Sequence, residues 1–179
     1  MEIGFLRNRK SRENSVDAID VGANIGWFSL LAASNSATVL SIEPMEYNLE
    51  LMRASMRLNP GFDIRAVKAD VSDVATSLEV QCMQPQSGGD PNTNQDNGQV
   101  RTFQGGMKCT EKTSLVTLDQ VLADVDPVIM SHGVYVMKID IEGYETKAVM
   151  GGRPSRTTRT SKTLVMICGT MARDWNMNL

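Results

Sequence analysis

The sequence predicts an α/β protein with a Rossmann-like fold, in which a mostly parallel sheet carries helices on both faces. Residues 15–69 alternate short β-branched runs with helical segments in the order βαβαβ, which is typical of a doubly wound parallel sheet. The first of these runs leads through a glycine-containing turn into a helix, as in many nucleotide-binding sheets. With 179 residues, 41% of them hydrophobic, the chain is long enough to bury a core.

The first half of the chain supplies three predicted strands separated by two predicted helices. The strands are short runs rich in Val and Ile, and each is followed by Gly, Glu-Pro or Asp. The helices repeat apolar residues at helical spacing, as in Ile25, Phe28 and Leu31. Strands are expected at 15–21, 38–42 and 64–69, and helices at 25–34 and 47–58. We expect Met52, Met56 and Trp27 to pack in the core rather than bind a ligand.

In the second half of the chain, a long polar segment interrupts the alternation of strands and helices. Residues 83–99 contain a single apolar residue among Gly, Pro, Asn and Gln, so we expect a mobile loop there. The flanking residues 77–82 and 100–103 are expected to pair as a hairpin. Further strands are expected at 134–141 and 163–168, with helices at 118–123 and 144–150, the latter ending at a Gly-Gly pair.

Three regions differ in composition: a basic N-terminal segment 1–14, a folded domain 15–152 and a basic tail 153–179. The tail carries five Lys or Arg against one Asp, whereas the whole chain has a net charge of −3, which argues against a nucleic-acid binder. No apolar run reaches the roughly 20 residues of a membrane-spanning helix. The N-terminus lacks the apolar stretch of a signal peptide, so a cytoplasmic location is expected. Three cysteines are too few for a disulfide scaffold.

The turn after the first strand is the first candidate site. Gly22, Ala23, Asn24 and Gly26 are small enough to let a ligand approach the backbone, and N–H groups exposed at the helix start would favour an anionic group. A dinucleotide-binding turn would have a glycine in place of Asn24. Asp20 would repel a pyrophosphate but attract an ammonium group. The turn therefore favours S-adenosylmethionine, which carries an ammonium group, over NAD.

Acidic residues follow the next two strands. Glu43, 21 residues after Gly22, is placed to accept hydrogen bonds from both hydroxyls of a ribose, and Asp70 to accept one from an adenine amino group. Each residue also has a structural explanation, because Glu43 could start a helix and Asp70 could be a solvated loop acid. Their order along one edge of the sheet favours binding of a nucleoside cofactor.

The block Lys138-Ile-Asp-Ile-Glu-Gly closes the strand expected at 134–141. Charged residues at the end of an apolar strand are costly to bury unless they face a cleft, so we expect Asp140 and Glu142 at the active site. The alternative is a structural ion pair with Lys138. His132, the single histidine, is a third candidate for a base. Two carboxylates alone do not make a metal site, and none is predicted.

Four blocks resemble, in order, FkbM-type methyltransferases over about residues 16–152: DVGANIGWFSLLAA, SIEPMEYNLELMRASMRLN, VTLDQVL and KIDIEGYETKAVMGG. The resemblance implies a class I methyltransferase fold, S-adenosylmethionine as methyl donor, and O-methylation of a sugar or other small molecule. By position, it assigns cofactor binding to Asp20, Gly22, Asn24, Gly26, Glu43 and Asp70, with Asp140 between donor and acceptor.

The sequence departs from this family after Gly152. Residues 153–163 are rich in Ser, Thr and Arg without an apolar face, and Cys168 stands where an acid is expected, so the last strands of the sheet are expected to be incomplete. The leading hypothesis is a methyltransferase in which Asp140 or Glu142 takes the proton of the acceptor hydroxyl. The alternatives are a cofactor-binding module without catalysis, favoured by the unusual C-terminus, and an NAD-dependent oxidoreductase, supported only by the turn.

Overall fold

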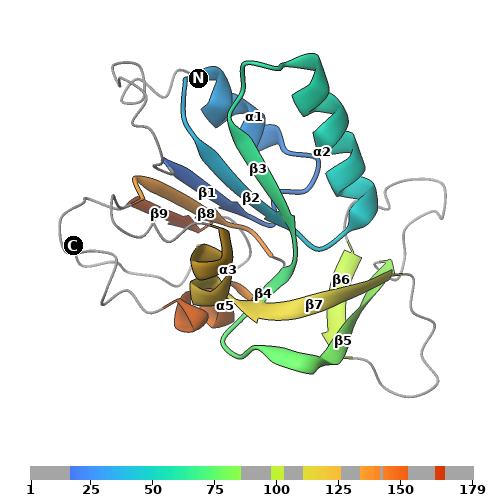
Figure 1. Ribbon diagram of the computed structural model, residues 1–179. Helices are drawn as coiled ribbons and strands as arrows, with labels where there is room; N and C mark the ends of the chain where they lie inside the picture. Colours follow the sequence, from blue (N-terminus) through green and yellow to red (C-terminus); the bar gives the residue numbers. More distant parts are fainter. Residues whose placement is uncertain are drawn as a thin grey trace.

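The computed structural model describes residues 17–85, 98–102, 111–125, 134–141, 143–152 and 164–167. They form a five-stranded sheet with helices on both faces and a four-stranded sheet beside it (Figure 1). The basic segment 1–14, Glu142, His132 and all of the tail except 164–167 lie outside these ranges. Within the described part of the chain, no helix has both the length and the apolar character needed to cross a bilayer.

The larger sheet is parallel throughout, in the order β3-β2-β1-β8-β9. Its first three strands alternate with two helices, which confirms the predicted βαβαβ order and the Rossmann-like fold. A further helix connects β8 to β9, so the strand expected in the tail joins the same sheet. The elements are β1 (Ala18–Val21), α1 (Trp27–Ser34), β2 (Val39–Glu43), α2 (Glu46–Leu58), β3 (Ile64–Lys68), α3 (Leu118–Val125), β8 (Val136–Ile139), α5 (Glu145–Gly151) and β9 (Leu164–Ile167).

Alternation along the strands divides the core into two clusters, one on each face of the sheet. On β1, Ile19 and Val21 belong to the cluster beneath α3 and α5, whereas Ala18 belongs to the cluster beneath α1 and α2. Met52 is fully buried in the second cluster and Met56 packs against it, as predicted. Because both faces are covered, polar groups on these strands are exposed mainly at the strand ends.

The inner face of α1 differs from the prediction. Its buried residues are Ser29, Ala32 and Ala33, and Trp27 is 77% exposed. Trp27 is the first residue of the helix and lies opposite these small side chains on the helical wheel. The expected packing of Trp27 in the core is therefore wrong, because the helix approaches the sheet through its small residues.

The second sheet was predicted only in part. It contains β4 (Asp70–Ser72), β7 (Glu111–Thr117), β5 (Thr76–Pro85) and β6 (Gly98–Thr102), in the order β4-β7-β5-β6. The expected hairpin is present as the antiparallel pair β5–β6, but its strands extend into the segment 83–99 that was assigned to a loop. Hydrogen bonds between the two backbones hold these polar residues in strands without an apolar pattern.

The Gly-Gly pair at the end of α5 was expected to end the helix, but its role in the structure is different. Gly152 has φ −101°, so it does not adopt the left-handed conformation of a glycine helix cap. A Cβ atom on Gly151 would instead lie 2.0 Å from the carbonyl oxygen of Ser72. The absence of a side chain at Gly151 therefore lets α5 pack directly on β4.

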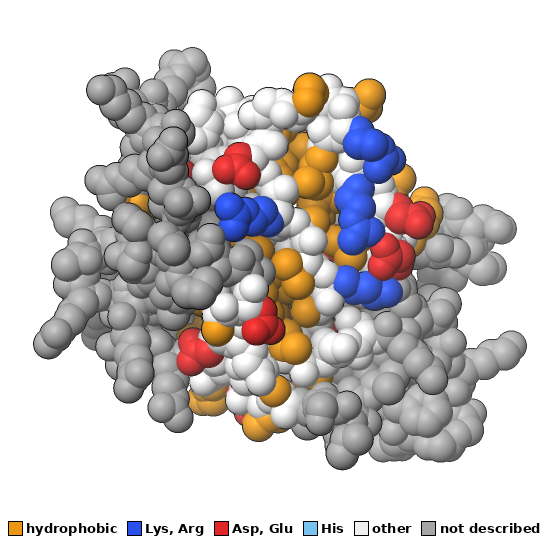
Figure 2. Space-filling model, viewed as in Figure 1, with side chains coloured by type: hydrophobic (Ala, Val, Ile, Leu, Met, Phe, Trp, Pro, Cys, Tyr) orange, Lys and Arg blue, Asp and Glu red, His pale blue; other side chains and the backbone are white. Residues whose placement is uncertain are grey.

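The surface around α2 carries both signs of charge. Figure 2 shows basic and acidic side chains next to one another on this face. Glu46, at the start of α2, is paired with Arg53 on the same helix and with Lys68 at the end of β3. Such exposed pairs contribute little to stability, because water screens them.

Candidate functional site

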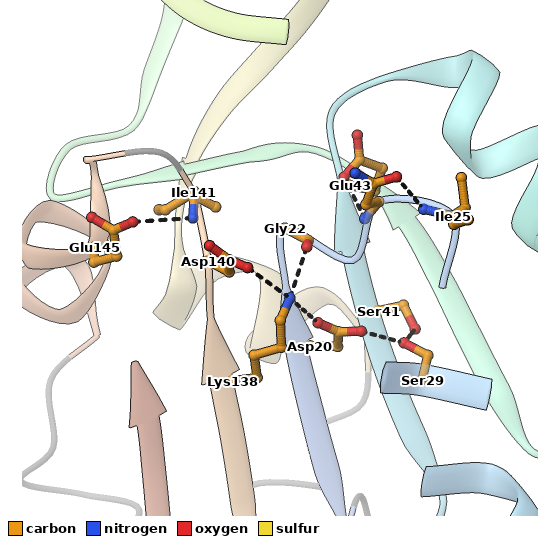
Figure 3. A network of polar contacts seen from close by, with 11 residues as sticks. Asp20, Gly22, Ile25, Ser29, Ser41, Glu43, Lys138, Asp140, Ile141 and Glu145 are labelled. Atoms are coloured by element: carbon orange, nitrogen blue, oxygen red, sulfur yellow. Dashed lines mark hydrogen bonds and ion pairs between the residues drawn. The ribbon is translucent and has the colours of Figure 1, made fainter. Parts of the chain in front are cut away.

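The predicted site residues gather at the carboxyl edge of the larger sheet. Val21 pairs with Ile42 on one side and with Ile139 on the other, so the residues that follow them emerge at one level. The chain leaves β1 toward β2 on one side, while β8 pairs on the opposite side. The crevice above such a reversal of strand order is where ligands of open α/β sheets bind. The residues at this level are Gly22, Glu43 and Asp140, as Figure 3 shows.

The turn after β1 is compact because three of its residues have positive φ angles: Gly22 (74°), Asn24 (52°) and Gly26 (88°). A Cβ atom on Gly22 would lie 2.0 Å from the carbonyl oxygen of Asp140, so only glycine fits. Asn24 tolerates the left-handed conformation better than most residues do. Its side-chain oxygen accepts a hydrogen bond of 2.6 Å from the N–H of Ile25.

The N–H groups of residues 22–26, which precede the first residue of α1, are already bonded within the protein. Gly22 and Ala23 donate to the carbonyl oxygen of Ile42, and Gly26 donates to that of Ala23. The N–H of Asn24 donates to Glu43, 2.9 Å away. The left-handed residues direct these donors toward the protein, so the turn itself offers a pyrophosphate little to bind.

Glu43 is buried and connects three segments of the chain. Its Oε2 atom accepts the hydrogen bond from Asn24, while Oε1 accepts one from the Met45 N–H (3.0 Å) and one from the Asn48 amide (3.1 Å). Burial raises the pKa of Glu43, and these hydrogen bonds act in the opposite direction. A carboxylate has about four acceptor positions, so one on Oε2 remains for a ligand.

Asp70, the first residue of β4, has a buried oxygen atom without a partner. Its Oδ1 atom accepts a hydrogen bond from the N–H of Val71 (2.9 Å), whereas Oδ2 has no hydrogen bond within the described part of the chain. Burial raises the pKa of Asp70 to about 7, and repulsion from Glu43 adds to this. Buried polar atoms in native proteins nearly always form a hydrogen bond, so we expect a ligand or a solvent molecule to donate one to Oδ2.

Asp20 lies below the turn and is completely buried, with 0% exposure. Its Oδ2 atom accepts a hydrogen bond from Ser29 (2.7 Å), and Ser29 also bonds Ser41 (2.7 Å). Its Oδ1 atom lies 3.0 Å from the ammonium group of Lys138, which also donates to the carbonyl oxygen of Gly22 (3.0 Å). Lys138, rather than an ammonium group of a ligand, therefore supplies the cation beside Asp20.

Asp140 follows β8, and its side chain is 40% exposed. Its Oδ2 atom is 3.9 Å from the ammonium group of Lys138. Burial raises the pKa of Asp140; Lys138 opposes this effect, while Glu145 and Asp20 reinforce it. Glu142, the other predicted catalytic carboxylate, lies outside the described residues.

Glu145 is a buried carboxylate that the sequence analysis did not single out. Its Oε1 atom accepts hydrogen bonds from the N–H groups of Ile141 (3.3 Å) and Gly143 (3.1 Å), whereas Oε2 has no partner within the described ranges. Glu145 therefore shapes the turn that carries Asp140. An acidic residue at the first position of a helix, two residues after a glycine, was the available signal. Among the described residues, no three His, Cys, Asp or Glu side chains could together hold a metal ion.

Comparisons with solved structures give a limited likeness to WbdD. The 2.2 Å crystal structure of WbdD is 30% identical over 31% of this chain and 13% of the WbdD chain, with a TM-score of 0.30. Monomeric WbdD gives the same identity and TM-score over 14% of its chain. The matched part is thus a small fraction of WbdD, and the fold described above rests on the strand order of this protein alone. No curated protein sequence matches the chain significantly.

The family comparison covers far more of the chain. The profile of the methyltransferase FkbM domain matches residues 20–171. The match starts at Asp20 and includes the turn, Glu43, Asp70 and the end of β8. It also continues past Gly152 through β9, where the sequence analysis expected the resemblance to stop. The chain therefore belongs to the FkbM methyltransferase domain family.

Proposed function

We propose that this protein is an S-adenosylmethionine-dependent methyltransferase that acts on a hydroxyl group of a sugar or other small molecule. Membership of the FkbM family supports methyl transfer. The choice of cofactor is carried by Asp70, whose buried Oδ2 atom has no hydrogen-bond donor among the described residues. The amino group of adenine is such a donor, and Asp70 lies close enough to Glu43 for the two carboxylates to repel each other.

The other residues at this edge fit the same ligand. Glu43 has one acceptor position left for a ribose hydroxyl, while its remaining hydrogen bonds hold the turn and the start of α2 in place. Gly22 and Gly26 let the turn pack closely, because a Cβ atom would lie 2.0 Å from the Asp140 carbonyl oxygen at Gly22 and 2.6 Å from the Met52 side chain at Gly26. NAD fits less well, because a dinucleotide-binding turn has a glycine in place of Asn24, and the N–H groups of residues 22–26 are bonded within the protein.

The protein's part in the reaction is to position the acceptor and take its proton. When bound, S-adenosylmethionine supplies an electrophilic methyl group on a sulfonium. Holding the acceptor oxygen in line with that carbon can supply much of the rate. A carboxylate beside the acceptor would accept the hydroxyl proton, and Asp140 and Glu142, after β8, are the candidates.

The cofactor proposal can be tested by calorimetric titration with S-adenosylmethionine and S-adenosylhomocysteine. The wild-type protein should bind both. Asp70→Asn should weaken binding by about tenfold or more, because its amide would place a donor opposite the adenine amino group. Asp73→Asn is the matched control, because Asp73 is exposed, and it should leave the Kd unchanged. Circular dichroism checks that each variant is folded.

The reaction itself is tested with a donor carrying a labelled methyl group and a pool of sugars and other hydroxyl compounds. Label should pass to a hydroxyl oxygen. Binding without transfer to any acceptor would favour the cofactor-binding module. A folded protein that ignores both ligands but binds NAD would favour an oxidoreductase.

A further inference from the structure

Lys138 lies at the centre of the polar network below the turn. Its ammonium group is 3.0 Å from Asp20 Oδ1, 3.0 Å from the carbonyl oxygen of Gly22 and 3.9 Å from Asp140 Oδ2 (Figure 3). The side chain is only 14% exposed. One cation therefore connects β1, the turn that follows it and the end of β8.

The two carboxylates beside this cation differ in access. Asp20 is completely buried, and its oxygens are bonded to Lys138 and Ser29. With no exposed surface, Asp20 is out of reach of a ligand in this arrangement. The Asp140 side chain is 40% exposed and meets Lys138 only at the longer distance of 3.9 Å. Asp140 is thus the carboxylate of this network that a ligand can reach.

We propose that Lys138 is a positioning residue that holds the Asp140 carboxylate beside the glycine turn, and that Asp140, rather than Asp20, receives the ammonium group of the bound donor. This inference rests on the proposed function. It moves the ammonium group from Asp20, where the sequence analysis expected it, to Asp140.

The backbone supports this assignment. The N–H of Asp140 donates to the carbonyl oxygen of Val21 (3.0 Å), and the Asp140 carbonyl lies against Gly22, where a Cβ atom would come within 2.0 Å. The turn and the end of β8 are therefore in direct contact. An ammonium group bound by Asp140 would lie next to the turn, at the reversal of strand order.

The surrounding charges explain why Asp140 needs Lys138. Among the residues that the structure describes, three charged groups act on its carboxylate: Lys138 from β8, Asp20 from β1 and Glu145 from α5. Burial and both carboxylates raise the pKa of Asp140, and Lys138 opposes them. Without Lys138, Asp140 would keep its proton to a higher pH and would lose its attraction for an ammonium group.

The test compares two ligands, S-adenosylhomocysteine and 5′-methylthioadenosine, which lacks the amino-acid group. Their Kd values are measured by calorimetry between pH 5 and pH 8. Both ligands contain adenosine, so the ratio of the two Kd values cancels the effect of protein groups that titrate near the adenosine. In the wild type, the preference for S-adenosylhomocysteine should fall at low pH as Asp140 gains its proton. In Lys138→Met this fall should move to higher pH, because Asp140 loses the cation that opposes the rise of its pKa, and the two profiles should converge at the upper end of the range.

Three variants make the result specific. Lys138→Arg keeps the cation and should preserve the wild-type profile. Glu145→Gln removes a repelling charge but keeps the Oε1 atom that bonds the turn, so the fall should move to lower pH. Lys147→Met changes an exposed lysine that lies over the Tyr144 ring, and should have no effect.

Lys138→Met leaves the buried Asp20 carboxylate unpaired and could unfold the protein. The double variant Asp20→Asn/Lys138→Met controls for this, because it removes the buried carboxylate together with its cation. The upward shift should persist in it, although reduced. If the wild type binds neither ligand, the proposed function fails. If it binds both, and Lys138→Met weakens both equally without a pH shift, Lys138 only supports the fold and this inference is overturned.

Discussion

Lys138 and Asp20 face each other at the same register position of two adjacent parallel strands, with 3.0 Å between the ammonium group and Asp20 Oδ1. Ser41 occupies the same position on the next strand, β2. Ser29 from α1 bonds both Asp20 and Ser41. A row of polar side chains thus crosses three strands inside an otherwise apolar core, directly below the turn.

Breaking this buried pair should be costly. Asp20→Ala is expected to lower the free energy of unfolding by about 3–5 kcal/mol, because the Lys138 ammonium loses its buried counter-charge. Asp63→Ala, at an exposed carboxylate, should change it by less than about 1 kcal/mol. Urea denaturation measures both values. Asp20→Asn and Lys138→Met should together cost less than the sum of the two single changes, and strict additivity would contradict the pairing.

Gly22 should be the least replaceable glycine of the turn region. Gly22→Ala combines a φ of 74° with a Cβ atom 2.0 Å from the Asp140 carbonyl oxygen, so a loss of more than about 2 kcal/mol and loss of cofactor binding are expected. Gly143→Ala has a φ of 97° but open space, and should cost about 1 kcal/mol. Thermal unfolding of both variants separates the clash from the backbone strain. Equal losses would mean that the clash is relieved by movement of β8.

Gly151 offers a test in which helix propensity and packing predict opposite signs. Alanine is favoured over glycine by about 1 kcal/mol inside a helix, so propensity alone predicts that Gly151→Ala stabilises the protein. The contact with the Ser72 carbonyl oxygen, 2.0 Å from the new Cβ atom, predicts destabilisation. Gly152→Ala meets only the Leu118 side chain, at 3.1 Å, and should be better tolerated. A higher melting temperature for Gly151→Ala would rule out the close packing of α5 on β4.

Asp70 should make the protein less stable as the pH rises. Burial raises its pKa from 3.8 to about 7, so the folded protein binds more protons than the unfolded chain between these values. The free energy of unfolding therefore falls from about pH 4 to about pH 7 and then levels off. Asp70→Asn removes this term and should gain stability relative to the wild type over the same interval, by on the order of a few kcal/mol. Urea denaturation at pH 5, 6, 7 and 8 measures the difference, and a constant difference would contradict the raised pKa.

The two carboxylates after β8 should separate in binding and turnover experiments. Asp140→Asn removes the proposed partner of the ammonium group, so the Kd of S-adenosylhomocysteine should rise by about tenfold or more. Glu142→Gln removes the proposed base, so the rate of methyl transfer should fall by about a hundredfold or more while the Kd stays near the wild-type value. The reverse pattern would exchange the two roles.

The main sheet and its functional edge could be predicted because their signals are local. Short β-branched runs alternate with helical segments, and the side chains that follow parallel strands meet at one edge. These patterns alone place Gly22, Glu43 and Asp140 at that edge. The strands β4 and β7 were missed, because short polar strands are held by partners that the local sequence does not reveal.

The amino-acid sequence by itself determined the βαβαβ order of the first three strands, the family and the edge where the candidate site lies, since each depends on patterns within a few neighbouring residues. Only the tertiary structure decided which carboxylate a ligand can reach. Lys138 is 118 residues from Asp20 in the chain, and the pairing of β1 with β8 brings them together. It also decided that Gly151 serves packing and that Trp27 faces outward. Such properties depend on which surfaces meet in three dimensions, and local sequence patterns do not specify that.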